Sequence, residues 1–403
     1  MNIAPLSTVT SYQSGSILPA AGTEGLWAGR VWIPADRAPR GIAGPHVVAV
    51  REGRLFLTPY PTFSDLLNDP DCVSVLAEVS TEVAAFEEVV EASRFDRRAG
   101  KLDDETQIIL LAPNDLPATK ACGVTFIRSL LERVIEEKAK GDPAKATEIR
   151  QLILDTLGND LSEVTPGSPE TEALKAKLID AGVWSQYLEV GIGKDAEIFT
   201  KAQPMASVGY GAQIGILPNS SWNNPEPEIV LAVAADGTIR GATLGNDVNL
   251  RDYEGRSALL LGEAKDQNAS CAIGPLVRLF DDTFALSDIK EMEVELSVTG
   301  EDGYVVTGRN CMSEISRPPE TLVAQACGEH HQYPDGFMLF LGTMFAPTDD
   351  RDQAGGGFTH HLGDRVEIST PQLGRLVNWV NHTNAIPPWE YGTRRLLEFL
   401  SST

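Results

Sequence analysis

A fully apolar run from Ile229 to Val233, entered through two glutamates, constrains the fold more than any other stretch of the chain. Such a run predicts a strand buried inside a sheet. Because side chains in a strand alternate between its two faces, Glu226 and Glu228 point the same way. Pro225 and Pro227 suit the start of a strand or an unpaired edge, since proline has no N–H to donate to a ladder.

A second strand is expected directly after the first. The turn at Asp236-Gly237 and the strand at 238–243 predict a hairpin, which would return Asp247 to the side of Glu226 and Glu228. Three hard oxygen ligands in one pocket suit Mg²⁺ or Mn²⁺ better than zinc. A simpler interpretation also fits, in which the glutamates form a charged strand edge and Asp247 caps a following helix.

Length and composition favour a globular chain of two domains. The chain has 403 residues, 42% of them hydrophobic, and no apolar run near 20 residues, so no membrane span is expected. The first residues lack the basic and apolar regions of a signal peptide, which predicts a cytoplasmic location. Five cysteines without metal-ligand spacing fit reduced thiols better than a disulfide framework.

The charge balance bears on possible partners. With 57 acidic and 33 basic residues, the formal net charge is −24, which argues against binding to nucleic acid or to an anionic membrane. An anionic substrate would also be repelled at long range. Such a substrate would need a local cationic focus, which a divalent metal with nearby lysine and arginine could supply.

The order of the predicted elements suggests a small N-terminal β-rich domain over residues 1–115 and a larger domain over residues 116–403. In the first, strands at 46–50 and 54–57 form a hairpin, and Thr62 caps a short helix.

In the larger domain, residues 127–182 are predicted to form a helical insert, whose last helix starts at Ser168-Pro169. A strand is expected at Tyr187–Val190. An alternating apolar pattern predicts another hairpin over residues 291–307.

Several motifs together resemble the fumarylacetoacetate hydrolase superfamily, and within it the dehydratases of 2-keto-3-deoxy sugar acids. They are Glu226-x-Glu228, the segment Asn246-Asp247-Val248, and Lys265 ahead of Ile273-Gly274-Pro275. The resemblance runs from about Leu110 to the C-terminus. It implies an α+β, β-rich fold with a mixed β-sandwich or roll as catalytic domain, a bound Mg²⁺ (or Mn²⁺), and a homodimer or homotetramer.

The same resemblance implies residues that contact substrate. Arg128 and Ser129 would open a helix beside the substrate, and Lys201 and Thr343 would contribute further contacts. Without the resemblance, Arg128 reads as a solvated residue of a capped surface helix, and Glu197 with Lys201 as an exposed ion pair on one strand face.

For activity, the resemblance implies metal-dependent dehydration of 2-keto-3-deoxy-D-arabinonate, the same compound as 2-keto-3-deoxy-D-xylonate, to 2-oxoglutarate semialdehyde. Lys265 would be the base that takes the C3 proton, or a Schiff-base former, and Glu197 would protonate the departing hydroxyl.

Two other classes stay open. A C–C hydrolase or decarboxylase of the same superfamily would use the same metal on acylpyruvate or oxaloacetate, but its usual His/Glu pair has no histidine to match it in residues 124–137. A non-catalytic metal-binding protein would not need Lys265 and Glu197. Of the adjacent His360 and His361, at most one could join a site, because neighbours on an extended segment face opposite ways.

Overall fold

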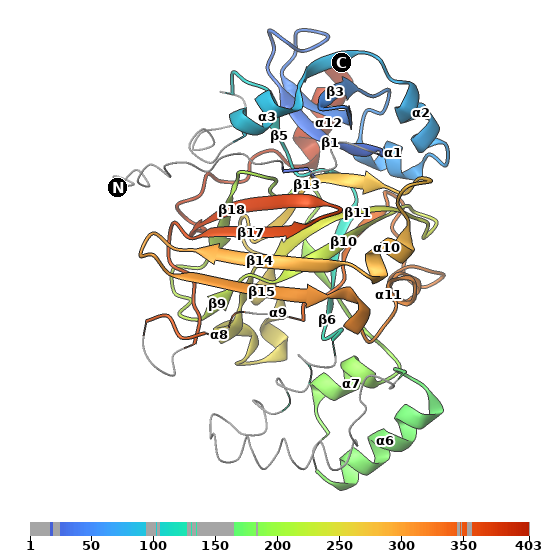
Figure 1. Ribbon diagram of the computed structural model, residues 1–403, viewed down its shortest axis with the longest axis vertical. Helices are drawn as coiled ribbons and strands as arrows, with labels where there is room; N and C mark the ends of the chain where they lie inside the picture. Colours follow the sequence, from blue (N-terminus) through green and yellow to red (C-terminus); the bar gives the residue numbers. More distant parts are fainter. Residues whose placement is uncertain are drawn as a thin grey trace.

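Two β-sheets pack face to face in the computed structural model. In the view of Figure 1, the N-terminal elements, which include strands of the larger sheet, lie at the top, and helices α6 and α7 lie at the bottom. The structure describes residues 17–18, 25–93, 102, 105–126, 130, 134, 165–182, 184–344, 347, 349–352 and 357–402. Arg128, Ser129 and most of the predicted helical insert lie outside these residues. The strand-rich mixed α/β architecture predicted from the sequence is confirmed.

The central sheet has eleven strands within the described residues, in the order β4-β3-β2-β1-β13-β11-β10-β16-β6-β7, with β5 paired to β1. Its strands are β1 (Trp27–Ile33), β2 (Gly44–Arg51), β3 (Arg54–Leu57), β4 (Glu82–Ala85), β5 (Ile109–Leu110), β6 (Ala118–Gly123), β7 (Glu197–Ala202), β10 (Pro227–Val233), β11 (Ile239–Asp247), β13 (Cys271–Leu279) and β16 (Phe337–Phe340).

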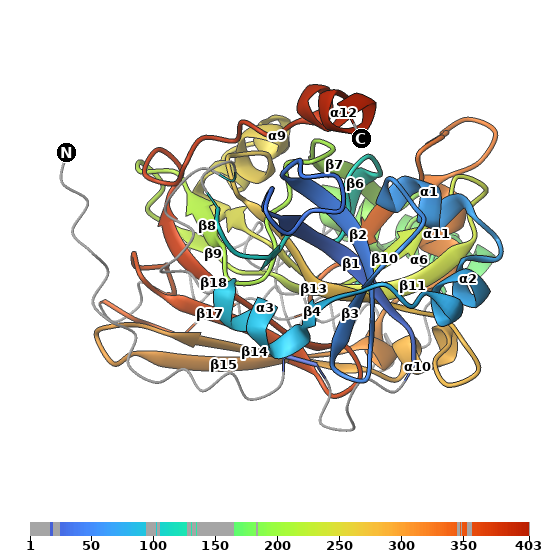
Figure 2. The same ribbon diagram turned by 90° about the horizontal axis from the view of Figure 1, so that it is seen from above.

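A five-stranded sheet, in the order β15-β14-β17-β18-β8, forms a layer along one side of the central sheet, as Figure 2 shows from above. Its strands are β8 (Gln213–Ile216), β14 (Glu293–Thr299), β15 (Val305–Cys311), β17 (Arg365–Thr370) and β18 (Gly374–His382). A short ladder joins β9 (Asn223–Asn224) to β12 (Asn249–Leu250). The predicted hairpin over residues 291–307 is confirmed by the β14–β15 pairing.

Helices connect and cover these strands. They are α1 (Phe63–Asn68), α2 (Cys72–Glu78), α3 (Phe86–Ala92), α6 (Pro169–Asp180), α7 (Gln186–Ile192), α8 (Arg251–Glu254), α9 (Leu261–Lys265), α10 (Leu286–Lys290), α11 (Pro319–Ala326) and α12 (Thr393–Ser402), with 3-10 turns η4 (Ala258–Leu260) and η5 (Met312–Glu314). Among the described residues, every helix is too short or too polar to span a bilayer.

Strand β10 is buried on both faces, which explains its continuous apolar sequence. Ile229, Leu231 and Val233 belong to the large apolar cluster between the two sheets. The alternate residues Val230 and Ala232 belong to a second cluster on the opposite face of the central sheet. Two buried faces leave no polar position in the run, and the prediction of a buried strand is confirmed.

One predicted strand is wrong. Residues 187–190 lie in helix α7, not in a strand. The Ser185 side chain accepts a hydrogen bond from the Leu188 N–H and so caps the helix, while Leu188 and Ile192, four residues apart, pack on a small helical cluster. The apolar residues fit a helix period as well as a strand, and the serine cap decides between them.

The predicted boundary near residue 115 does not interrupt the sheet. Strand β1 pairs antiparallel with β13, so the N-terminal strands continue the central sheet. The guanidinium of Arg30 on β1 lies 3.4 Å from the Asp115 carboxylate and donates to the Asn114 carbonyl. The division of the chain into two domains at residue 115 stays a prediction.

Candidate metal and catalytic site

The β10–β11 hairpin brings three acidic side chains together. Glu228 pairs with Gly245 across the ladder, and the Asp247 N–H donates to the Glu226 carbonyl at 3.1 Å. Carboxylate oxygens of Glu226, Glu228 and Asp247 all lie within 4.8 Å of one another, and all three residues are buried. The glutamates do not form an exposed strand edge, because β10 is a central strand of its sheet. Asp247 does not cap a helix, because the next helix, α8, begins only at Arg251.

Two buried lysines face this cluster. The Lys265 ammonium lies 2.5 Å from Glu226 Oε2 and 2.9 Å from Asp247 Oδ2. Burial lowers the pKa of Lys265, but the carboxylates of Asp247 and Glu226 outweigh that effect and raise this pKa well above its ordinary value. These contacts favour the charged ammonium form of Lys265.

Lys201 lies behind the cluster. Its fully buried ammonium is 2.8 Å from Asp247 Oδ1 and donates to the backbone carbonyls of Val248 and Lys265. Lys201 is absent from the described residues that line the pocket. These partners suit a residue that holds Asp247 and the end of α9 in place, and the predicted contact of Lys201 with substrate stays a prediction.

Glu228 differs from its two neighbours because no ion pair reaches its carboxylate within the described residues. Its Oε2 accepts a hydrogen bond from the Gly342 N–H at 2.6 Å. Burial, together with the nearby charges of Asp247 and Glu226, raises the pKa of Glu228 well above its usual range. Among the described residues only two buried ammonium groups, those of Lys201 and Lys265, pair with the three carboxylates, so the ionised form of Glu228 has no partner cation and its protonated form is favoured.

The cluster suits a hard divalent cation. Its donors are carboxylate oxygens from three residues, the ligand type that Mg²⁺ and Mn²⁺ prefer. A bound cation would supply the positive charge that the ionised form of Glu228 lacks. The adjoining cavity of about 30 Å³ has room for one ion or water molecule.

The walls of this cavity include most of the residues that the sequence singled out. Glu197, Lys265 and Thr343 line it beside the three carboxylates. The other described lining residues are Cys122, Gly123, Val124, Phe199 and Glu254. Burial, and then the charges of Glu228 and Glu197, raise the pKa of Cys122 well above its usual range, so this thiol stays protonated.

Gly123 makes room for the Glu197 side chain. The two residues are partners in the β6–β7 ladder, and a Cβ atom on Gly123 would lie only 2.1 Å from Glu197 Oε2. The carboxylate therefore packs directly over the glycine backbone on the pocket side. A methyl group at this position would therefore displace the Glu197 carboxylate from its place in the pocket.

Val124 forms a strained part of the wall. Its φ of 53° lies in the left-handed region, which a β-branched residue seldom adopts. The conformation is fixed from behind, because the Thr125 hydroxyl donates to the Leu341 carbonyl at 2.6 Å and the Thr125 carbonyl accepts from the Ser316 N–H. Such strain is common where the chain must present a side chain to a site.

Sequence reasoning missed Asn249 and Glu254. The Asn249 amide donates to Glu226 Oε1 at 3.1 Å and to Glu254 Oε2 at 2.6 Å, so it ties helix α8 to the carboxylate cluster. The position of Asn249, two residues after Asp247, was the available signal. No sequence signal indicated Glu254, because its contact with Asn249 depends on how helix α8 packs against the strand.

The two adjacent histidines lie elsewhere. His360 Nδ1 is 3.2 Å from Asp364 Oδ2, and His361 is placed between Asp302 and Asp352. Neither histidine is among the described residues that line the carboxylate pocket. All five cysteines are free thiols, as the sequence predicted.

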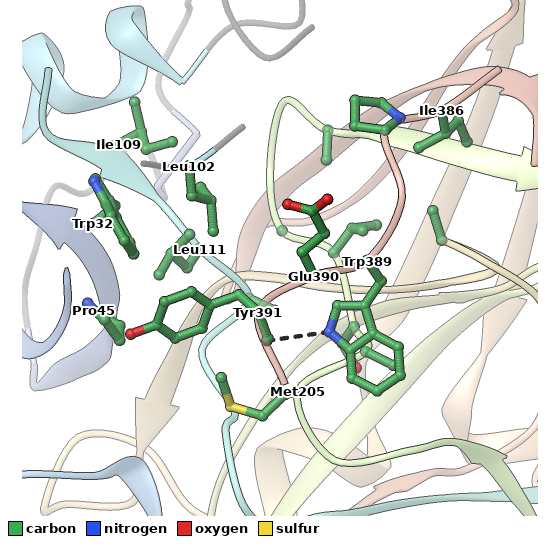
Figure 3. A pocket seen from close by; sticks show the side chains of 18 of the residues that line it. Trp32, Pro45, Leu102, Ile109, Leu111, Met205, Ile386, Trp389, Glu390 and Tyr391 are labelled. Atoms are coloured by element: carbon green, nitrogen blue, oxygen red, sulfur yellow. Dashed lines mark hydrogen bonds between the residues drawn. The ribbon is translucent and has the colours of Figure 1, made fainter. Parts of the chain in front are cut away.

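A larger cavity of about 210 Å³ lies apart from the carboxylates (Figure 3). Trp32 and Tyr391, with ring centroids 5.4 Å apart, stand on one side of it and Trp389 on the other. Within the described residues, this cavity shares no lining residue with the carboxylate pocket and holds no cluster of metal-ligand type. The larger cavity therefore lacks a group of metal ligands among its described lining residues. The smaller cavity contains one and is the candidate site.

Sequence comparisons connect this chain with keto-acid dehydratases. The model of the family described as fumarylacetoacetate (FAA) hydrolase C-terminal matches residues 189–381. A probable 2-keto-3-deoxyxylonate dehydratase of Haloferax volcanii is 30% identical over 206 residues, which cover 51% of this chain and 67% of that protein. The 2-dehydro-3-deoxy-D-arabinonate dehydratase of Saccharolobus solfataricus is 30% identical over 190 residues, covering 47% of this chain and 60% of that protein.

Solved structures share the fold. One of 2-keto-3-deoxy-D-arabinonate dehydratase, complexed with magnesium and 2,5-dioxopentanoate, aligns with a TM-score of 0.60 at 20% identity, over 88% of this chain and 99% of that one. A 5-carboxymethyl-2-hydroxymuconate delta-isomerase from Mycobacterium smegmatis aligns with a TM-score of 0.50 at 17% identity, over 88% and 98%. One architecture thus occurs with two kinds of named activity.

Proposed function

Because this chain belongs to the fumarylacetoacetate hydrolase family, we propose that it is a metal-dependent dehydratase of a 2-keto-3-deoxy sugar acid. The observation that carries the proposal is the buried cluster of Glu226, Glu228 and Asp247, with Lys265 bonded into it. The names of the two curated relatives suggest the substrate, 2-keto-3-deoxy-D-arabinonate, which is the same compound as 2-keto-3-deoxy-D-xylonate. We propose a cytoplasmic homodimer or homotetramer as its form.

Glu226, Glu228 and Asp247 would hold the divalent ion. When bound, Mg²⁺ or Mn²⁺ would act as a Lewis acid toward the keto group of the substrate. Thr343, which lines the same pocket as Glu228, would also contact the substrate. Arg128 and Ser129 are proposed as further contacts, on the family resemblance alone.

Lys265 would take the proton from C3. Its ammonium forms ion pairs with Glu226 and Asp247, so it must lose this stabilisation before it can act as a base. A cation shared by the same carboxylates disfavours a second positive charge beside it and would lower the pKa of Lys265 toward the working pH. The position at the pocket wall supports the role.

Glu197 would act as the acid for the departing C4 hydroxyl. Its carboxyl group lies over Gly123 on the wall that also includes Lys265. Removal of the C3 proton by Lys265 and protonation of the hydroxyl by Glu197 release one water molecule and form a C3–C4 double bond. Transfer of a proton from C5 to C3 then gives an enol, whose tautomer is 2-oxoglutarate semialdehyde.

The test is incubation of the purified protein and Mg²⁺ with 2-keto-3-deoxy-D-arabinonate. A coupled NAD(P)-dependent dehydrogenase reports the semialdehyde, and a parallel sample contains EDTA. We expect product with Mg²⁺ and none with EDTA. Absence of product, together with pyruvate release from acylpyruvates or oxaloacetate, would replace the dehydratase by a C–C hydrolase or decarboxylase.

A further inference from the structure

Glu197 is the first residue of strand β7, which is the last strand at one edge of the central sheet. On its inner side it pairs with Gly123 of β6, and no strand of the described residues lies on its outer side. Backbone at the end of an edge strand opens more readily than backbone inside a sheet. The residues just before Glu197 must therefore be held by other contacts if its carboxyl group is to keep a fixed place in the pocket.

Arg317 supplies the first of these contacts. It lies two residues before helix α11 and is only 2% exposed. Its guanidinium donates to the Gly193 carbonyl at 2.7 Å and to the Val190 carbonyl at 2.9 Å, and makes a longer bond of 3.4 Å to the Lys194 carbonyl. One planar group with several donors thus joins the last turn of α7 to the chain that leads into β7.

Gln325, on α11, continues this support up to the residue before Glu197. Its Oε1 accepts a hydrogen bond from the Ala196 N–H at 2.7 Å, and its Nε2 donates to the Lys194 carbonyl at 3.4 Å. Capping of α7 alone would need only the bonds at the end of the helix. Because the contacts extend to Ala196, they fix the start of β7 as well as the helix.

The segment 315–325 also holds the other strand of this pair. Ser316 donates both its N–H and its hydroxyl to the Thr125 carbonyl, at 2.8 Å and 2.9 Å. Thr125 lies two residues after Gly123, over which the Glu197 carboxylate packs. The segment therefore joins the chain after Gly123 to the chain before Glu197, and so fixes how the two residues lie relative to each other.

We infer that Arg317 is a positioning residue, which together with Gln325 keeps the Glu197 carboxyl group in place for proton transfer to the departing hydroxyl. The inference rests on the proposed function, because it takes Glu197 as the acid. Arg317 is not among the described residues that line the pocket, so it acts through the backbone and not by contact with the substrate. A displacement of about 1 Å can slow such a step by about 100-fold.

The test compares two reactions of the Arg317→Lys variant, which keeps the charge and loses the planar set of donors. One is dehydration of 2-keto-3-deoxy-D-arabinonate, which uses Glu197. The other is exchange of the C3 protons of 2-oxopentanoate with D₂O. This keto acid has no C4 hydroxyl, so its exchange needs Lys265 and the metal but not Glu197. We expect kcat for dehydration to fall at least about tenfold, and the exchange rate to stay within about twofold of the wild type.

A double variant asks whether Arg317 acts through Glu197. In the Glu197→Gln background, Arg317→Lys should lower the residual kcat by less than about twofold, because the carboxyl group that it positions is already lost. Gln325→Ala releases the same segment from the other side. It should also lower kcat more than C3 exchange, and it replaces Arg317→Lys if that variant does not fold.

Arg30→Lys is the matched control. Arg30 is also buried and also donates to backbone carbonyls, those of Ala112 and Asn114, but it lies outside the described lining of the carboxylate pocket. The control variant should lose thermal stability while kcat for dehydration stays within about twofold of the wild type.

The outcomes separate this inference from the proposed function. Equal losses of dehydration and of C3 exchange in Arg317→Lys, or an unchanged kcat, would overturn the positioning role while dehydration by the wild type still stands. A wild type that does not dehydrate the sugar acid would overturn the proposed function. Amide hydrogen exchange followed by mass spectrometry needs no substrate and then decides for Arg317. Faster exchange over residues 193–202 in Arg317→Lys, but not in Arg30→Lys, would keep it as the residue that positions Glu197, and unchanged exchange would overturn that role.

Discussion

Glu228 is the residue at which the need for a cation is most evident. Its carboxylate is buried, accepts one backbone hydrogen bond, and has no ion pair among the described residues, whereas Glu226 and Asp247 each contact Lys265. A buried charge without compensation destabilises the fold, and a bound cation reverses the effect.

Glu228→Gln should therefore stabilise the metal-free protein by about 1–3 kcal/mol at neutral pH, since the amide keeps the bond to Gly342 without the charge. Mg²⁺ should raise the thermal midpoint of the wild type and leave that of the variant unchanged. Differential scanning calorimetry with EDTA and with Mg²⁺ measures both. Glu263→Gln, an exposed change on α9, is the control. A wild-type response of Glu228→Gln to Mg²⁺ would remove Glu228 from the metal site.

Asp364 gives a prediction about pH. Burial alone would raise its pKa, but hydrogen bonds from Arg351 and His360 outweigh burial and lower the pKa of Asp364 to about 2. A carboxyl group with a lower pKa in the folded than in the unfolded state stabilises the fold above the unfolded pKa, near 4, and loses this contribution as the pH falls toward 2.

Asp364→Asn should thus reduce the free energy of unfolding by at least about 2 kcal/mol at pH 7 and flatten the decline below pH 4. Urea unfolding from pH 7 to pH 3 measures both effects. Asp302→Asn removes the other carboxylate bonded to Arg351, which is half-exposed, and should cost less because solvent screens that pair. Equal losses in the two variants would contradict the assignment.

Local sequence patterns predicted some of the helices and strands correctly and others incorrectly. The β10–β11 hairpin followed from an apolar run, a Gly turn and residue parity, which are all local. Helix α7 was predicted as a strand because the four residues Tyr187–Val190 have mixed polarity and fit either period. The Ser185 cap, which favours the helix, lies outside that stretch. The hydrogen bond from Asn249 to Glu254 depends on how helix α8 packs against the strand, so no local pattern indicates Glu254.

The β6–β7 pair yields a test of Glu197. Gly123→Ala would force the Glu197 carboxylate to move, because the added methyl group would otherwise meet Oε2 at 2.1 Å. We expect kcat for dehydration to fall at least about tenfold while the affinity for Mg²⁺, titrated by calorimetry, stays the same. Gly328→Ala, which has no positive φ and no neighbouring atom within 4 Å of the added methyl group, controls for the general cost of such a change. Unchanged kcat in Gly123→Ala would exclude Glu197 as the acid.

For the whole molecule, net charge and site charge combine in one consequence. The net charge of −24 repels an anionic keto acid at long range, and the described residues that line the site include more carboxyl groups than lysines. Attraction of the substrate therefore depends on the cation at the cluster. Composition alone could predict that an anionic substrate needs a cation at the site. It could not predict that the central sheet continues across residue 115, which is evident only from the pairing of β1 with β13.

The most direct test of the central claim is exchange of the C3 protons of 2-oxopentanoate with D₂O, followed by ¹H NMR. This keto acid has no C4 hydroxyl, so only proton removal at C3 is measured, whatever the sugar stereochemistry. If Lys265 removes the C3 proton next to a bound metal, exchange should require Mg²⁺ and stop with EDTA. Exchange should be lost in Lys265→Ala although this variant still binds Mg²⁺ in a calorimetric titration. Rapid exchange in Lys265→Ala, or equal exchange with and without the metal, would contradict it.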